Sequence, residues 1–317
     1  MKVILTRVSR KFHRRAARRG TYNPHVLDFV RSAYRVVLQR DPEPEALAWA
    51  IGELESGRLS RATFVADLVG SDEFARLRVL EDAIAHAARA RAERIRPRAL
   101  TAPAWSDERL IEIPWVLARY RSEPRVLDVG YANASPVYLQ ALVAAAPGEI
   151  VGVDPVEARV EGVRSVVGDL RALPFADSSF DVVFCVSTLE HVGRDNRVYG
   201  AKEERDETGI SAALRELRRI GLRILLTVPT GAEEDHGWFV QLPVATWRRL
   251  FADAGLEIAE EEVYELDQSG WSSAAGDAAG ARYGTRGTAA SAAYCVELRA
   301  GNARTAPPAS DRPRAED

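Results

Sequence analysis

The stretch RVLDVGYANA, residues 125–134, decides the fold. A short apolar run leads into Asp128 and Gly130, and the chain then continues into helix-forming sequence. This order predicts a β-strand, a tight turn and the N-terminus of a helix. Gly130 lets the backbone bend tightly and approach a ligand. Unpaired amides at such a turn favour a polar cofactor, and Asp128 can accept hydrogen bonds from a ligand's ammonium group or from bound water.

Three further segments place acidic residues near predicted strands. EIVGVDP (149–155) ends a second strand at Asp154, whose carboxylate suits the two hydroxyls of a ribose. VRSVVGDL (163–170) carries Asp169 after a third strand, and LPFADSSFDVVFCVSTLEHVG (173–193) predicts a fourth. The alternation of strands and helices from residue 125 onward indicates a parallel sheet with helices on both faces.

On these four motifs, in this order, residues 105–298 resemble the class I S-adenosylmethionine-dependent methyltransferases, in particular those acting on small molecules and glycans. The resemblance implies an α/β fold with a seven-stranded, doubly wound, Rossmann-like sheet, and S-adenosylmethionine as cofactor. It places Asp128 near the methionine end, Asp154 on the ribose and Asp169 at the adenine. The expected cofactor-binding residues are Asp128, Gly130, Tyr131, Ala132, Asp154, Pro155, Asp169, Leu170 and Ser187.

The glycine-rich turn departs from the family pattern. Only Gly130 stands where the family has three glycines, and Ala132 and Ala134 hold the other two places. Because alanine disfavours positive φ, we expect a rearranged turn and a reduced cofactor affinity. The same change disfavours NAD, whose second phosphate–ribose unit needs the room of a glycine-rich turn.

Three long connections, 192–207, 229–242 and 267–291, are predicted at the carboxyl ends of the strands, where they would build the acceptor pocket. An alcohol acceptor needs a general base, and histidine has the pKa for it. His191 and His236 follow the fourth and fifth strands, and Asp235 is a further candidate. We favour His236, since LEHVG around His191 is typical of the family whatever the substrate, and His191 can instead bond locally and shape the pocket.

The same loops hold other candidate groups. The run 233–236 offers three acids and a histidine that could ligate Mg²⁺, but a solvated loop is the favoured interpretation and no metal is expected. Trp238, Trp271 and Tyr283 could stack on a sugar or aromatic acceptor, or could simply be packed. A helix over 106–120, capped by Ser106, precedes the first strand, and its Glu112 and Trp115 are possible contacts, although roles in the helix surface and core are favoured.

Residues 22–96 read as helices with caps at Asn23, Ser60 and Ser71. Through RDPEPEAL and GSDEF, residues 22–80 resemble a helical domain of unknown function related to phycobilisome linkers, which often accompanies enzymes of bacterial surface glycans. The resemblance carries no site. We expect an interaction or positioning module at 22–96 before a methyltransferase domain at 103–300; the alternative is a bundle that only stabilises its neighbour.

Composition limits the class of protein and its location. Of 317 residues, 46% are hydrophobic, and no apolar run approaches the ~20 residues of a membrane span. Cys185 and Cys295 lie in predicted strands and are expected to be buried and unpaired, as in a reducing cytoplasm. Residues 1–20 hold eight Lys or Arg and no acid. This arm is either a solvated tail or a peripheral contact with the inner face of a membrane.

The net charge of −3 includes the basic arm, so the rest of the chain is acidic. An acidic surface argues against specific nucleic-acid binding. Residues 301–317 are predicted to be disordered. The leading hypothesis is O-methylation of a sugar, glycan or related surface metabolite, with the substrate suggested only by the accompanying helical domain. A methyltransferase of a secondary metabolite or lipid, and a scaffold without catalysis, are the alternatives. The oligomeric state is left open.

Overall fold

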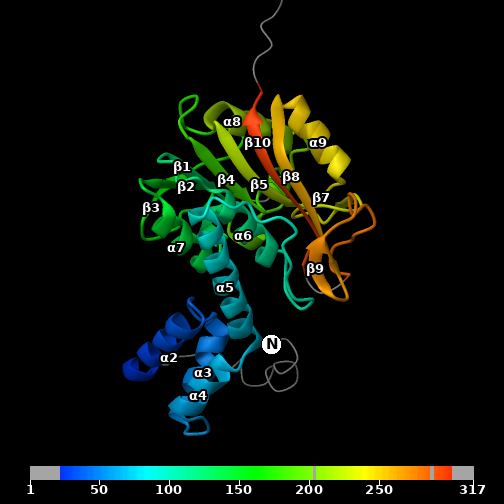
Figure 1. The fold of residues 1–317 in the computed structure, drawn as a ribbon. Coiled ribbons are helices and arrows are strands. Elements are labelled where there is room, and N and C mark those ends of the chain that lie inside the picture. Colours follow the sequence, from blue (N-terminus) through cyan, green and yellow to red (C-terminus); the bar gives the residue numbers. More distant parts are fainter. Residues whose placement is uncertain (1–21, 203–204, 286–288, 302–317) are drawn as a thin grey trace, which may run out of the picture.

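The computed structural model describes residues 22–202, 205–285 and 289–301 (Figure 1). The predicted basic arm, 1–20, and residues 302–317 of the predicted tail lie outside the described residues. Across the described ranges, no helix combines the length and apolar composition that a bilayer span requires. A small helical bundle comes first along the chain, and a large sheet flanked by helices follows (Figure 1).

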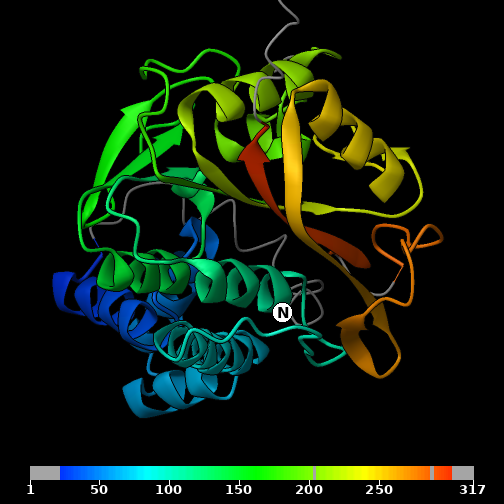
Figure 2. The ribbon, with the colours of Figure 1, turned by 45° about the horizontal axis from the view of Figure 1, so that its top comes forward.

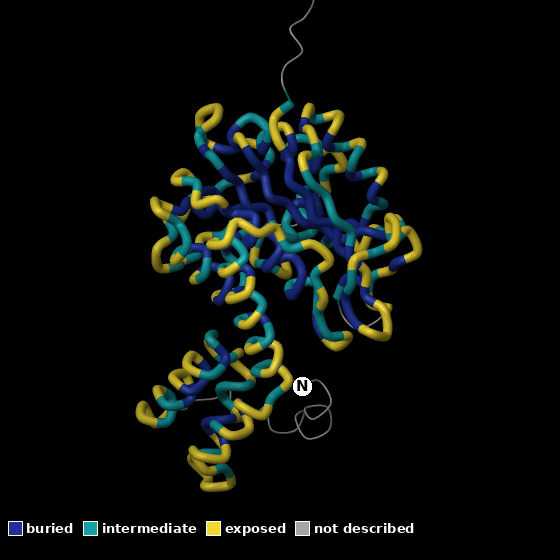
Figure 3. Tube along the Cα trace, viewed as in Figure 1, coloured by how far each residue is buried: buried dark blue, intermediate teal, exposed yellow. Residues whose placement is uncertain are grey.

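Four helices form the first part of the described chain: α2 (Pro24–Val37), α3 (Pro44–Glu55), α4 (Arg61–Val69) and α5 (Asp72–Ala92). The predicted caps are confirmed, because the side chains of Asn23, Ser60 and Ser71 each accept a hydrogen bond from a nearby backbone N–H. The apolar stripes meet in a small core of Val30, Ala33, Tyr34, Leu38, Ala50, Ile51, Phe64 and Leu68. Figure 3 shows much more exposed chain here than in the sheet.

Helix α5 belongs to both parts of the molecule. Phe74, near its start, packs with the bundle, whereas Leu80, Ile84 and Ala87 are buried in the core that includes helix α6 (Arg109–Arg119). The helix thus runs without a break from the bundle to Ala92, beside the sheet domain. A continuous helix of 21 residues is a stiffer connection than an irregular linker.

The sheet follows a doubly wound order, β3-β2-β1-β4-β5-β10-β8-β9. Leu127 of β1 lies opposite Val151 on one side and Val183 on the other, so β1 is central and buried on both faces. The strands are β1 (Val126–Val129), β2 (Ile150–Asp154), β3 (Val163–Val167), β4 (Val182–Val186), β5 (Arg223–Pro229), β8 (Leu256–Asp267), β9 (Gly270–Ser273) and β10 (Ala292–Ala300).

Helices cover both faces, as predicted (Figures 1 and 2). Helices α6 and α7 (Pro136–Ala145), with the second half of α5, pack on one face around Trp115, Tyr138 and Phe184. Helices α8 (Gly209–Ile220) and α9 (Val244–Asp253) pack on the other around Leu217 and Trp247. Cys185 and Cys295 are buried and unpaired, as predicted.

Three details differ from the sequence prediction. The sheet has an eighth strand, β9, which extends the edge beyond β8 as a hairpin. Strand β10 runs antiparallel to β5 and β8, because no helix in the described part of 267–291 carries the chain back across the sheet. Residues 155–162, where the alternation of strands and helices leads us to expect a short helix, form bends and irregular chain with one turn, since so short a segment gains little from helix nucleation.

Candidate active site

The turn after β1 is built around Gly130. Its φ of 80° is left-handed, and a Cβ here would come within 2.3 Å of the Thr188 Oγ1. Thr188 donates a hydrogen bond to the carbonyl of Val129, which closes the turn after β4 onto the turn after β1. Residues Tyr131–Asn133 form the 3₁₀ helix η1, and neither Ala132 nor Ala134 takes a positive φ. The rearranged turn therefore accommodates both alanines without backbone strain.

Asp128 and Asp154 lie at the ends of neighbouring strands. Asp128 is buried; its Oδ1 accepts a hydrogen bond from the Tyr138 hydroxyl, and its Oδ2 has no partner within the described residues. Burial raises the pKa of Asp128 to about 8. Asp154 accepts from the N–H of Val156 (2.9 Å) and of Ala132 (3.3 Å), and its burial also raises its pKa. The second bond fixes η1 to the tip of β2.

The other expected cofactor residues differ in how far their side chains are exposed. Asp169 is half exposed and ion-paired with Arg171, which lowers the pKa of Asp169. Pro155 is exposed. Leu170 is buried in the core on the α8 side of the sheet. Tyr131 is buried, with its hydroxyl 2.7 Å from the carbonyl of Ala158. Leu170 and Tyr131 thus turn their side chains away from solvent and leave mainly their backbone for a ligand.

A cavity of about 470 Å³ opens where β4 and β5 end, within the usual size of ~300–1,000 Å³ for a small-molecule site. We call it the catalytic cavity. The start of α6, the turn after β4 and the loops after β5 and β9 enclose it. Its chemically important lining residues are Arg76, Trp105, Asp107, Glu108, Arg109, Ser187, Glu190, His191, Tyr199, Trp238, Phe239 and Tyr283.

Ser187 connects the cavity to helix α6. Its φ of 43° is left-handed for a residue with a Cβ, a strained conformation of the kind that collects at functional sites. Its Oγ donates to the fully buried Glu112 (2.9 and 3.0 Å), which also accepts from Arg109 (2.7 Å). The expected cofactor residue Ser187 is therefore held in place by a buried carboxylate.

Two more carboxylates at the cavity wall are incompletely bonded. Glu108 and Glu190 each have an oxygen without a hydrogen-bond partner within the described ranges. Burial raises the pKa of Glu108 to about 7 and that of Glu190 to about 8. With Glu112 beside them, these groups favour a cationic ligand, which would restore their ionised form.

His191 faces the catalytic cavity. Its Nδ1 lies 2.8 Å from the carbonyl of Trp238, so Nδ1 carries the proton and Nε2 keeps its lone pair. Burial lowers the pKa of His191 to about 4, which keeps the ring neutral near pH 7. The carboxylate of Glu190 lies 3.8 Å from Nε2. The arrangement is that of an oriented acceptor of a proton.

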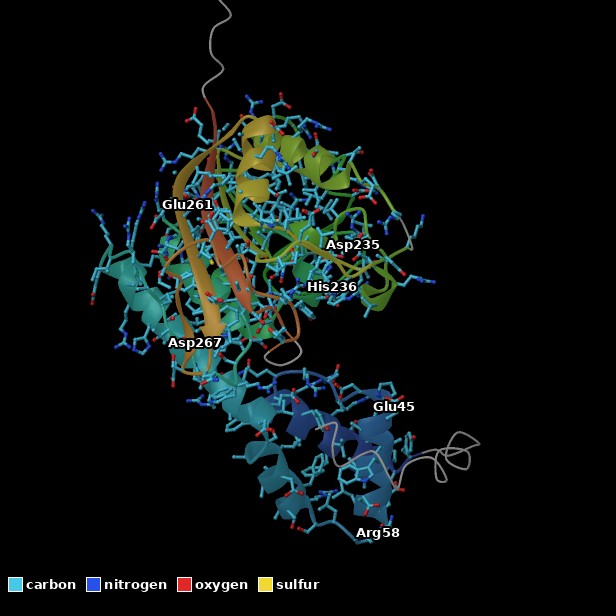
Figure 4. The ribbon with its side chains drawn as sticks, turned by 90° about the vertical axis from the view of Figure 1, so that its right-hand side faces the viewer. Glu45, Arg58, Asp235, His236, Glu261 and Asp267 are labelled. Atoms are coloured by element: carbon cyan, nitrogen blue, oxygen red, sulfur yellow. The ribbon has the colours of Figure 1, made fainter. Side chains whose placement is uncertain are left out.

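His236 and Asp235 lie in the short hairpin of β6 (Glu234–Asp235) and β7 (Val240–Gln241), on the sheet domain rather than the bundle (Figure 4). His236 stacks on Phe239 with ring centroids 4.5 Å apart and does not line the cavity. Asp235 is ion-paired with Arg205 (3.0 Å). Despite burial, its bond with the Gly237 N–H and nearby arginines lower the pKa of Asp235. The geometry thus favours His191 over both as a base.

The predicted aromatic residues divide between two roles. Trp238 and Tyr283 line the cavity, and Trp238 lies 5.3 Å from the ring of His191. Trp271 is buried, and its Nε1 donates to the carbonyl of Ser106. Trp115 is likewise in the core. Within the described chain, no group of three or more His, Cys, Asp or Glu side chains is arranged to hold a metal.

The predicted cap Ser106 was wrong, because its hydroxyl donates to the carbonyl of Pro103 and the helix starts three residues later. Asp107 instead accepts from the N–H of Arg109. Glu108, Glu190 and Arg76 were missed altogether as site residues. The available signal was Glu112, an acid in a mostly apolar helix. Because a buried carboxylate needs a partner, it indicated that further polar groups lie nearby.

Residues 127–220 match the family model described as a methyltransferase domain, a match that runs from β1 to the end of α8. This part of the chain is a methyltransferase domain. The match supports an S-adenosylmethionine-dependent methyltransferase, in which β1, β2 and β4 carry the predicted cofactor edge. Residues 8–78 match a domain of unknown function (DUF4214), which overlaps the helical bundle. Comparison with curated proteins gives no match.

Many solved structures resemble the methyltransferase at low identity. The 1,6-didemethyltoxoflavin-N1-methyltransferase of Burkholderia thailandensis is 12% identical, with a TM-score of 0.41, covering 86% of this chain and 91% of its own. A SAM-dependent methyltransferase of Methanosarcina mazei is 14% identical (TM-score 0.39; 59% and 97% covered). One of Aquifex aeolicus is 16% identical (TM-score 0.38; 60% and 89%). Likenesses this weak carry no argument about the acceptor.

The methyltransferase is expected to lose stability as the pH rises, because of its buried acids. Glu190 keeps its proton up to about pH 8 in the folded protein but ionises near its ordinary value of 4.5 when unfolded. Folding therefore takes up a proton between these values, and the free energy of unfolding falls with pH by up to about 1.4 kcal/mol per unit.

Glu190→Gln should reduce that fall, measured by urea unfolding across the window, whereas Glu157→Gln, at an exposed position, should leave it unchanged. An identical pH slope in wild type and Glu190→Gln would show that Glu190 is already ionised in the folded protein.

Proposed function

We propose that the methyltransferase transfers the methyl group of S-adenosylmethionine to a hydroxyl of a sugar, glycan or related surface metabolite. One observation carries the proposal. The catalytic cavity combines the free Nε2 of His191, a set of aromatic rings and buried carboxylates with unused oxygens. A base, flat apolar surfaces and hydrogen-bond acceptors are what recognition and deprotonation of a polyhydroxylated acceptor require.

The residues present fit the cofactor. The unpartnered Oδ2 of buried Asp128 and the unused oxygens of Glu108 and Glu190 suit the ammonium and sulfonium charges of its methionine end. Asp154 and Asp169, at the tips of β2 and β3, would hold the ribose and the adenine. When bound, the cofactor supplies a methyl group that is already activated. The chain's own task is to align the acceptor and take its proton.

His191 is the proposed base. Its Nε2 would take the hydroxyl proton, while the carbonyl of Trp238 holds the ring in orientation through Nδ1–H. Glu190, 3.8 Å from Nε2 and restored to its ionised form once the cationic end of the cofactor is bound, would stabilise the imidazolium that forms. His236, stacked on Phe239, would support that ring in the cavity wall rather than act on the acceptor.

The aromatic wall favours a sugar-like acceptor. The rings of Tyr199, Trp238, Phe239 and Tyr283 contact one another in a connected cluster beside His191. Their faces offer apolar contact to the C–H faces of a pyranose, and Asp107 offers an acceptor for its hydroxyls. The helical domain that precedes the enzyme adds an association with surface glycans, which is an argument of a weaker kind.

The test is a screen of neutral sugars, nucleotide sugars and glycan fragments for incorporation of labelled methyl, with calorimetric titration of S-adenosylmethionine alongside. We expect submillimolar cofactor binding that is lost in Asp154→Ala, and label on a hydroxyl oxygen of one acceptor class. Label on nitrogen or sulfur would overturn O-methylation. No cofactor binding would favour a scaffold without catalysis.

A further inference from the structure

A second cavity lies between the helical bundle and the methyltransferase domain. It has a volume of about 260 Å³ and opens between α5 and the starts of α6 and α7. We call it the junction cavity. It shares Arg76, Ser106, Asp107 and Arg109 with the catalytic cavity, so the two cavities adjoin, and Arg76, from the first turns of α5, lines both.

Arg76 differs from the other cations at this junction. Arg40 is ion-paired with Glu73, and Arg109 is paired with Glu112 at 2.7 Å. Two residues beyond Arg76, Arg78 is paired with Glu81. Arg76 is exposed and makes no ion pair or hydrogen bond within the part of the chain that the structure describes. Its guanidinium is therefore available to a ligand that reaches the junction.

The polar groups of the two adjoining cavities favour a ligand with an anionic group at one end only. Around His191 the cation in the wall, Arg109, is already paired with Glu112. Glu108 and Glu190 are acids, so an anionic group placed there would gain no free cation. At the other end Arg76 offers a planar fork of donors, which matches phosphate and carboxylate geometry. An acceptor with its hydroxyl at His191 and an anionic group directed toward Arg76 would match this distribution of charge.

Helix α5 gives Arg76 a fixed position relative to the chemistry. Leu80 and Ile84, one and two turns further along the same helix, are buried in the core that contains α6. Glu112 lies on α6 and Glu108 at its N-terminus. Arg76 on α5 and these acids are therefore held by two helices that pack on each other. The helical domain thereby contributes Arg76 to the lining of both cavities.

We infer that the acceptor carries an anionic group, a phosphate or a carboxylate, which Arg76 of the helical domain binds in the junction cavity. The inference rests on the proposed function, because it assigns the remote end of the acceptor methylated at His191. It makes Arg76 a specificity-determining residue.

The test measures the affinity of the full chain, with and without S-adenosylhomocysteine, for glucose 1-phosphate, glucuronate and glucose by calorimetry. Wild type should bind the two anionic probes at least about tenfold more tightly than glucose, as expected for a charge-assisted bidentate contact. Arg76→Gln should abolish this preference, and Arg76→Lys should restore part of it. Arg78→Gln, on the same helix but outside both cavities, should keep it.

Equal affinities of wild type for the charged and neutral probes would overturn the inference, as would a preference that survives Arg76→Gln. A loss of S-adenosylhomocysteine affinity in Arg76→Gln would also overturn it, because the bound anion would then be the carboxylate of the cofactor. Failure of the proposed function would appear separately, as an absence of cofactor binding or of methyl incorporation while the preference for anionic probes persists.

Discussion

Replacing His191 with alanine is expected to lower kcat for the true acceptor by about 10²–10⁴-fold, the usual contribution of a positioned general base. The affinity for S-adenosylhomocysteine should change little, because His191 is assigned to the acceptor and not to the cofactor. Steady-state kinetics and calorimetric titration on the same preparation separate the two effects. With a pKa of about 4, His191 is already neutral at pH 6, so the wild-type rate should not fall between pH 8 and about 6 for lack of free base.

His236→Ala is the matched control, since this histidine also lies in the aromatic cluster but does not line the catalytic cavity. It should retain turnover within about tenfold, because it removes only packing. His191→Gln guards against a packing effect, as glutamine keeps a similar volume and cannot act as a base. If His191→Gln keeps full activity while His236→Ala loses it, the base assignment is reversed.

Gly130→Ala should destabilise the fold by about 3 kcal/mol or more and abolish cofactor binding. The added Cβ would meet the Thr188 Oγ1 at 2.3 Å while the backbone keeps a φ of 80°. Relief requires Thr188 to move, which breaks its hydrogen bonds to the carbonyls of Val129 and Val186 and opens the contact between the two turns. Chemical unfolding and calorimetric titration measure the two consequences.

Gly57→Ala separates strain from collision, because Gly57 has a φ of 72° but nothing beyond its two chain neighbours would lie within 4 Å of the added Cβ. It should cost only about 1–2 kcal/mol. In a Thr188→Ala background, where the two nearest atoms, Oγ1 and Cγ2, are gone, the cost of Gly130→Ala should fall toward this value. A cost that is the same in both backgrounds would show that the Thr188 contact does not set the turn.

Local sequence signals were sufficient for most of the fold. Side-chain caps at Asn23, Ser60 and Ser71 start helices where they were predicted, because capping depends only on neighbouring backbone. The apolar runs give the central strands for a similar reason. The direction of β10 and the extra strand β9 depend on how a loop returns to the sheet, which a one-dimensional pattern does not contain.

The candidate site was likewise predictable from the sequence only in part. Carboxylates after parallel strands were predictable, since those strand ends meet at one edge of a sheet, and Asp128 and Asp154 do meet there. The sequence placed His191 and His236 equally well at that edge. Only the hairpin β6–β7 decides that His236 stacks on Phe239 while His191 faces the cavity. Arg76 comes from the helical domain, far earlier in the chain, so only tertiary packing could bring it into the site.

A crystal structure of the full chain with S-adenosylhomocysteine tests the central claim most directly. We expect the ribose hydroxyls on the carboxylate of Asp154 and the amino group near Asp128, with the sulfur end directed toward Ser187 and the catalytic cavity. A ligand bound away from these strand tips, or a sulfur atom separated from the cavity of His191 by the closed turn of Thr188, would contradict the account.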